Sequence, residues 1–129
     1  MKKIISVLIV TAVLIASIVW AQIVAETTLV DTTKKVDALM QNIAKIENIA
    51  NNETIFIAND LNEFWEQKEK ILSLIMNHND LNKIGEQIKK VVIYIEQNDK
   101  KNCEYELVTL KFYMESYKSV IEIRPEHLL

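Results

Sequence analysis

The strongest constraint on this chain is its N-terminal stretch, in which two lysines are followed by a run without any charge from Ile4 to Ala25. A helix rises about 1.5 Å per residue, so this run would be roughly 33 Å long. The hydrocarbon core of a bilayer is about 30 Å thick, which such a helix can cross. We therefore interpret residues 1–25 as an N-terminal transmembrane anchor that contacts the membrane through Ile4 to Ala25 and presents the rest of the chain on one side.

The charges that flank the apolar run predict its orientation. Lys2 and Lys3 lie directly before the run, whereas Glu26 and Asp31 are the first charged residues after it. Basic residues stay preferentially on the cytoplasmic side of a membrane. We therefore expect a single-pass protein of the cell membrane with a cytoplasmic N-terminus and an extracytoplasmic C-terminal domain.

A cleaved signal peptide is the competing interpretation of the same residues. Ala21 and Ala25 each stand at a possible cleavage site, two residues after an aliphatic side chain. However, the run is longer than the roughly 7 to 15 apolar residues of a usual signal peptide, which favours an uncleaved signal that stays as an anchor. Cleavage would instead release a secreted helical domain.

Composition limits what the remaining residues can form. The 129 residues include one glycine and one proline, which leaves little material for β-turns or glycine-rich phosphate-binding loops. The net charge is −3 and basic residues do not cluster, which argues against a nucleic-acid-binding surface. The single cysteine, Cys103, cannot form an intrachain disulfide. An all-α domain is the class that fits.

Four segments after the anchor carry apolar residues three and four positions apart, the pattern of helices with one buried face. These helices are predicted at about residues 27–50, 54–77, 81–95 and 100–122. The predicted core positions are, helix by helix, Leu29, Val36, Leu39, Ile43, Ile46 and Ala50; Ile57, Leu61, Phe64, Lys68, Ile71 and Ile75, widened by Trp65, Leu72 and Met76; Leu81, Ile84, Ile88, Val91 and Ile95; and Cys103, Leu107, Leu110, Met114, Tyr117 and Ile121, widened by Tyr105, Val108, Phe112 and Tyr113.

The short polar connections between these segments predict the architecture. Connections of about three or four residues make consecutive helices run antiparallel. We expect residues 26–123 to form an extracytoplasmic up-down antiparallel bundle of about four helices, the first of which can continue the anchor without a break. Pro125 ends the last helix, and residues 124–129 form a C-terminal tail. The same spacing would also serve a coiled coil between chains, so it leaves the oligomeric state open.

The sequence assembles no catalytic, cofactor-binding or metal site. The histidines, His78 and His127, are far apart, and neither has a second ligand three or four residues away. For His78 and Asp80 we weigh a metal site against a turn that caps the third helix, and capping accounts for both residues. Lys68 lies on an apolar stripe, either as a buried lysine available for chemistry or as a stem packed on apolar neighbours with its ammonium in water.

Aromatic residues of the second and fourth predicted helices raise one further alternative. Trp65, Phe64, Phe112 and Tyr113 would line a ligand cavity if they met inside the bundle. Core packing is the commoner role for aromatic residues at helical spacing, because each ring buries a large apolar area. Trp65, Lys68, His78 and Asp80 together form the possible interaction or structural motif of this sequence.

Several short segments resemble a known family: Trp65-Glu66-Gln67-Lys68, Ile71-Leu72-Ser73-Leu74, Asn77-His78-Asn79-Asp80-Leu81 and Tyr94-Ile95-Glu96-Gln97-Asn98-Asp99-Lys100. In these segments the chain is similar to domain-of-unknown-function family 4363, small clostridial-type membrane-anchored helical proteins, and the resemblance covers nearly the whole chain. It implies a retained anchor and an extracytoplasmic helical domain, and it draws attention to Trp65, His78 and Asp80. The family has no assigned activity, so the resemblance supplies no functional residues.

Two functions of different classes fit these patterns. The first is a non-enzymatic protein-interaction module of the bacterial cell envelope, anchored in the membrane and docking an envelope protein or a second copy of itself. The second is a ligand-binding or sensing bundle with a cavity near Trp65 and Phe112, acting through a membrane partner. No cofactor and no nucleic-acid partner is expected for either one.

Overall fold

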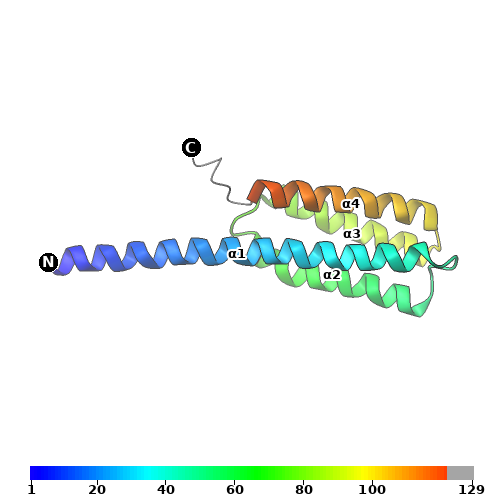
Figure 1. The fold of residues 1–129 in the computed structure, drawn as a ribbon, viewed down its shortest axis with the longest axis horizontal. Coiled ribbons are helices and arrows are strands. Elements are labelled where there is room, and N and C mark those ends of the chain that lie inside the picture. The colour runs from blue at the N-terminus through cyan, green and yellow to red at the C-terminus, as the bar shows by residue number, and fades with distance from the viewer. Residues whose placement is uncertain (122–129) are drawn as a thin grey trace.

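The computed structural model describes residues 1–121, and side chains as far as Ser119, as four α-helices. They are α1 (Lys2–Ala44), α2 (Asn52–Leu72), α3 (His78–Glu96) and α4 (Lys100–Ile121), shown in Figure 1. The described residues contain no strand. The predicted all-α fold, an apolar N-terminal helix followed by a four-helix bundle, is therefore confirmed. The predicted tail at residues 124–129 lies outside the described residues, as does the side chain of Ile121.

The first helix is one uninterrupted rod of 43 residues that belongs to two environments. Its residues 2–20 are all exposed, and the first buried side chain is Ala21, followed by Ala25, Thr28 and Leu29. Figure 1 shows this N-terminal part extending well beyond the other helices. Because no proline or glycine interrupts α1, nothing in its sequence breaks the backbone ladder between the two parts.

The four helices form a ring in which each one packs against two neighbours. The backbones of α1 and α2, α2 and α3, α3 and α4, and α4 and α1 lie close together, whereas in the described chain the backbones of the diagonal pairs do not. This is the up-down topology that short connections favour. The α2–α3 connection and the C-terminal end of α4 lie at the end of the bundle from which the exposed part of α1 emerges (Figure 1).

Two polar contacts set the register between α1 and α2. Lys35 Nζ donates to Asp60 Oδ2 at 2.8 Å, and Asn42 Nδ2 donates to Thr54 Oγ1 at 2.9 Å. Each step forward along α2 is therefore matched by about one step backward along α1. Extended along the helices, this register brings Leu74, just after α2, to the level of Ala21, where α1 leaves the bundle.

The core follows the predicted stripes in α1, α3 and the central line of α4, where Leu29, Val36, Leu39 and Ile43 are the buried positions of the α1 stripe, and it departs from the predicted stripe in α2. The α3 prediction is confirmed at every position, and four of the α4 positions, Cys103, Leu107, Leu110 and Met114, are fully buried. In α2 the buried line is rotated. It runs through Thr54, Ala58, Leu61, Trp65 and Leu72, while Ile57, Phe64, Lys68, Ile71 and Ile75 are only half-buried.

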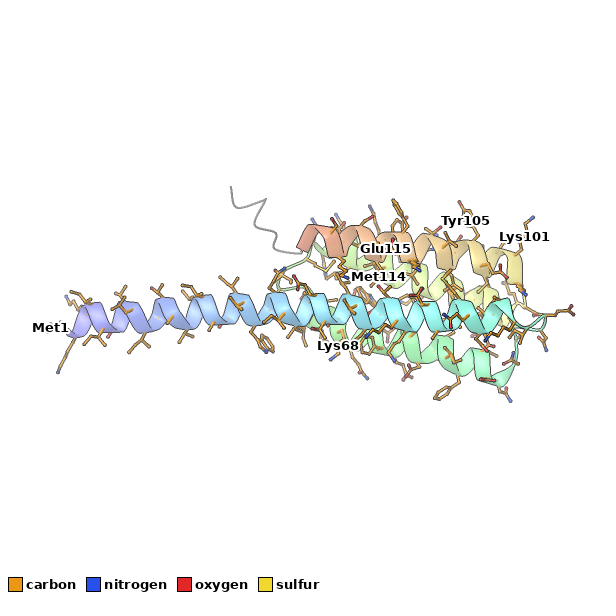
Figure 2. All side chains as sticks on the ribbon, viewed as in Figure 1. Met1, Lys68, Lys101, Tyr105, Met114 and Glu115 are labelled. Carbon is orange, nitrogen blue, oxygen red and sulfur yellow. The ribbon has the colours of Figure 1, made fainter. Side chains whose placement is uncertain are left out.

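The prediction for the flank of α4 is wrong. Tyr105, Val108 and Phe112 were expected to thicken its buried face, but they are 69%, 58% and 65% exposed. At 100° per residue these positions lie on the side of the helix opposite Leu107 and Leu110, so they cannot reach the core. Figure 2 shows Tyr105 on the outer side of α4.

The end of α1 also differs from its prediction. The helix stops at Ala44 instead of Ala50 because asparagine side chains bind the backbone that follows: Asn51 Oδ1 accepts from Thr54 N at 2.8 Å and caps α2, and Asn48 Oδ1 accepts from Ala50 N at 3.1 Å. Such local bonds compete with helix continuation. Ile49, within the connection, is fully buried and completes the core at this end.

Candidate binding groove between α2 and α3

The four residues of the predicted motif have different surroundings. Trp65 is 1% exposed and packs between α2 and α3. Lys68 is half-buried, with Nζ 5.8 Å from the centroid of the Phe64 ring, which agrees with a packed stem and an ammonium that reaches outward. The structure therefore does not bring these two side chains into one site.

His78 and Asp80 lie at the start of α3 and serve its architecture. His78 is exposed and is the first residue of the helix, while the cap is Asn77, whose Oδ1 accepts from Asn79 N at 2.8 Å. Asp80 lies near the hydroxyl group of Tyr117 on α4. Burial, followed by this nearby carboxylate, raises the pKa of the Tyr117 hydroxyl. Asp80 thus joins α3 to α4.

A polar groove of about 430 Å³ runs between α2 and α3, with Trp65 in its wall. Its other lining residues are Asn62, Glu66 and Glu69 of α2 and Asn82, Gly85, Glu86 and Lys89 of α3. Because Phe112 is exposed on the far side of α4, the expected cavity between Trp65 and Phe112 does not form. The groove beside Trp65 is the feature that the structure provides in its place.

Two buried polar atoms in this groove have no hydrogen-bond partner within the described part of the chain: Trp65 Nε1 and Asn62 Oδ1. The first is a donor and the second an acceptor. The two residues are three positions apart on α2, and side chains at that spacing are neighbours on a helix surface. Buried polar groups are nearly always satisfied in native proteins, so each unsatisfied one calls for an explanation.

The only glycine of the chain lies next to the indole ring in the wall of the groove. A Cβ atom at Gly85 would lie 3.4 Å from Trp65 Nε1 and 3.6 Å from Cδ1. Both distances are ordinary contacts, so packing does not demand a glycine here. A glycine inside a helix costs roughly 0.5 to 1 kcal/mol relative to alanine. The indole N–H is itself covered by neighbouring atoms, and the glycine adds no side chain to that cover.

The remaining groove residues give it a negative character. Glu66, Glu69 and Glu86 stand against a single lysine, Lys89. Glu66, Glu86 and Lys89 are exposed, long side chains that can rotate away from the indole edge. The groove therefore offers a donor, an acceptor and carboxylates to a ligand that carries an acceptor, a donor and positive charge.

Other chemistry is sparse in the described chain. Within residues 1–121, no three His, Cys, Asp or Glu side chains are close enough to hold a metal ion. Cys103 is fully buried in the core. Burial, followed by the Glu104 and Asp99 carboxylates, raises the pKa of its thiol to about 12, so the thiol is a core group. His127 lies outside the described residues.

Sequence reasoning finds Trp65 but misses its groove partners. Asn62 looks like any polar residue on the surface of a helix, and only the fold brings it beside Gly85. The one available signal is the lone glycine in the middle of the third stripe, since a glycine inside a helix usually has a packing or functional reason.

These features define an all-α protein, a four-helix bundle whose first helix is long and apolar enough to cross a membrane. The model of one family, described as Domain of unknown function (DUF4363), matches residues 23–124. The chain belongs to this family, as its resemblance in sequence implies. No curated protein and no solved structure matches the chain significantly.

Proposed function

We propose that this protein is a non-enzymatic interaction module of the bacterial cell envelope, a single-pass protein whose bundle stands on the outer face of the membrane. The observation that carries the proposal is the continuity of α1. Its residues 4–20 leave large apolar side chains such as Leu8, Leu14 and Trp20 about 60% exposed, and α1 then enters a well-packed bundle. An apolar cylinder of this size is unstable in water.

A retained anchor fits this packing better than a cleaved signal peptide does. Cleavage after Ala25 would remove Ala21 and Ala25, which are 7% and 1% exposed, from the bundle. The expected boundary between residues 25 and 26 thus falls inside one continuous helix. We propose that the membrane-spanning part of α1 ends, and its bundle part begins, near Ala21.

The outer face of α4 supports a docking role. Tyr105, Val108 and Phe112 are spaced three and four residues apart and form an exposed apolar stripe along the helix. A helix face of this kind usually packs on another element. The proposed partner is an envelope protein or a second copy of the chain. Aromatic residues at such a centre are favourable contact residues in interfaces.

Photo-crosslinking in cells tests this function. We would place a photoreactive phenylalanine at Tyr105 or Phe112, and at Phe56 of α2 as the matched control, because Phe56 is an aromatic side chain that is 73% exposed on another helix. We expect adducts with one protein species, or a homodimer, from positions 105 and 112 and none from 56. Adducts absent from all three positions would contradict the interaction role. Immunoblots of membrane and medium fractions, with intact mass, test the anchor separately.

A sensing bundle stays as the second candidate, and the groove beside Trp65 favours it. A sensor of this kind would pass its signal through a membrane partner. If a small molecule altered crosslinking from Tyr105 while binding near Trp65, this function would be preferred to simple docking.

A further inference from the structure

From the two unpartnered atoms in the groove, we propose a further binding site between α2 and α3 that takes a peptide segment with a basic side chain. Trp65 Nε1 would donate to a backbone carbonyl of the segment, and Asn62 Oδ1 would accept from a backbone N–H. The groove is built by α2 and α3 alone, so this site does not depend on the membrane orientation or on the α4 stripe.

The polar atoms define the backbone part of the ligand. The donor and the acceptor lie on neighbouring positions of one helix and are both buried without a partner among the described residues. One residue in extended conformation presents its own N–H and C=O to the same side, so a short extended segment can satisfy both atoms. Leaving such atoms unpaired costs free energy, and this cost favours a ligand that pairs them.

The charged residues define the side-chain part of the ligand. Glu66, Glu69 and Glu86 outnumber Lys89 around the groove, so a cation near its mouth is favoured and an anion is disfavoured. Lysine and arginine both carry a positive charge on a long apolar stem. A segment that combines a peptide unit with such a side chain matches the donor, the acceptor and the charge of the groove together.

Trp65 Nε1 is covered in the structure, so the proposed ligand reaches it when exposed groove side chains such as Glu66 and Glu86 rotate aside. Gly85 adds no side chain of its own to this cover. An alanine methyl group would stand 3.4 Å from Nε1 without a clash, and unlike the long groove side chains it could not rotate away from the atom that the peptide carbonyl has to reach. The substitution therefore separates binding from folding, because it blocks access while leaving the helix intact or more stable. A single water molecule is the competing occupant, and it would make the groove a hydrated surface feature.

The test is a titration of the full chain, labelled with ¹⁵N and held in detergent micelles, followed through the indole N–H signals. The chain has two tryptophans, Trp65 in the groove and Trp20 in the exposed part of α1, so Trp20 is an internal control. The probe is the blocked peptide acetyl-Ala-Lys-Ala-amide, and its counterparts with norleucine or glutamate in place of lysine are the control ligands. We expect a saturable shift of the Trp65 signal with the lysine peptide, weaker shifts with the other two, and no shift of Trp20.

Matched variants then assign the site. We expect Glu86→Gln to raise the Kd about threefold, the size of an exposed charge interaction, while Glu96→Gln at the other end of α3 leaves it unchanged. We expect Gly85→Ala to abolish the saturable shift with the helix content unchanged. An unmoved Trp65 signal at millimolar peptide, or shifts that do not depend on the lysine, would overturn the proposal and assign water to the groove. Neither result would change the crosslinking expected from α4.

Discussion

The side chain of Asn98 accepts a hydrogen bond from the backbone N–H of Ile49, with Oδ1 and N 2.9 Å apart. The two residues lie in different connections, α3–α4 and α1–α2, at the end of the bundle away from the exposed part of α1. Asn98 also has φ 56, the left-handed conformation, and ends α3 with its own N–H bonded to Ile95 O and the N–H of Asp99 bonded to Tyr94 O. One residue thus ends a helix and ties two connections together.

Replacing Asn98 tests both of these roles. Alanine would lose the bond to Ile49 and would strain the left-handed backbone, so we expect Asn98→Ala to lower the free energy of unfolding by about 2 kcal/mol. Glycine tolerates the conformation, so Asn98→Gly should lose only about 1 kcal/mol, the value of the hydrogen bond. Urea unfolding of the full chain in micelles, followed by circular dichroism, measures both. Equal losses for the two variants would show that backbone conformation contributes nothing here.

Gly85 predicts a gain in stability that accompanies a loss of binding. Because the space at this position admits a methyl group, we expect Gly85→Ala to raise the free energy of unfolding by about 0.5 to 1 kcal/mol. The same urea titration measures this gain. A destabilised Gly85→Ala protein would mean that the methyl group displaces the Trp65 indole, and the variant could then not serve as a test of access to the groove.

The buried thiol of Cys103 should be unreactive in the folded protein. The thiolate is the nucleophile, and with the pKa raised to about 12 the folded protein holds almost no thiolate at pH 8. We expect iodoacetamide to modify Cys103 at pH 8 only after unfolding in urea, as read by intact mass. Rapid modification of the folded chain would show that α4 opens locally from the bundle.

The same thiol makes stability depend on alkaline pH. The folded chain holds the proton to about pH 12, whereas the unfolded chain releases it near the ordinary value of 9.0. The thiol's contribution is therefore present in full below pH 9 and is lost as the pH rises toward 12. We expect the difference in unfolding free energy between the natural chain and Cys103→Ala to shrink over that window, as measured by urea titrations at several pH values. A constant difference would contradict the raised pKa.

The register between α1 and α2 predicts a depth for the α2–α3 connection. Leu74 is 70% exposed at the level where α1 leaves the bundle, and Phe56 is 73% exposed near the opposite end. We would label Leu74→Cys and Phe56→Cys with an environment-sensitive fluorophore in a Cys103→Ala background reconstituted into vesicles. Lipid-attached quenchers should reduce the emission from position 74 and leave position 56 unchanged. Equal quenching at both positions would contradict the proposed orientation of the bundle relative to the membrane.

The sequence predicts the fold class and the cores of α1 and α3 well, because the spacing of their large aliphatic residues leaves one choice of face. In α4 it predicts the central line but also adds aromatic residues that face outward. It predicts the α2 face less well. There the fold buries Thr54 and Ala58, whose small side chains allow close packing, and leaves the larger Ile57 and Ile71 at the edge. Hydropathy favours burial of the larger residues. The row of α2 side chains that faces the core is decided instead by the positions of α1 and α3, which pack on either side of α2.

The groove lay beyond prediction for a different reason. Its polar atoms come from residues that are unremarkable in their own helices, and the site exists only because antiparallel packing brings Gly85 to the indole ring of Trp65. The sequence identified the tryptophan as a residue of interest, but it grouped Trp65 with Lys68, His78 and Asp80, which have other neighbours. Proximity along the chain was a poor guide to proximity across the two helices.

If the apolar part of α1 spans the membrane as proposed, the unbroken course of α1 fixes the rotation of the bundle relative to the membrane. Successive residues of a helix turn by about 100°, so inserting one residue near Ala21 would turn the α4 stripe and the groove by that angle around the axis of the span. A tilt of about 20°, typical of single spans, would swing the far end of the bundle sideways by roughly 12 Å. In the proposed arrangement, the rotation and tilt of the membrane-spanning part of α1 thus determine which face of the bundle is presented to neighbouring membrane proteins.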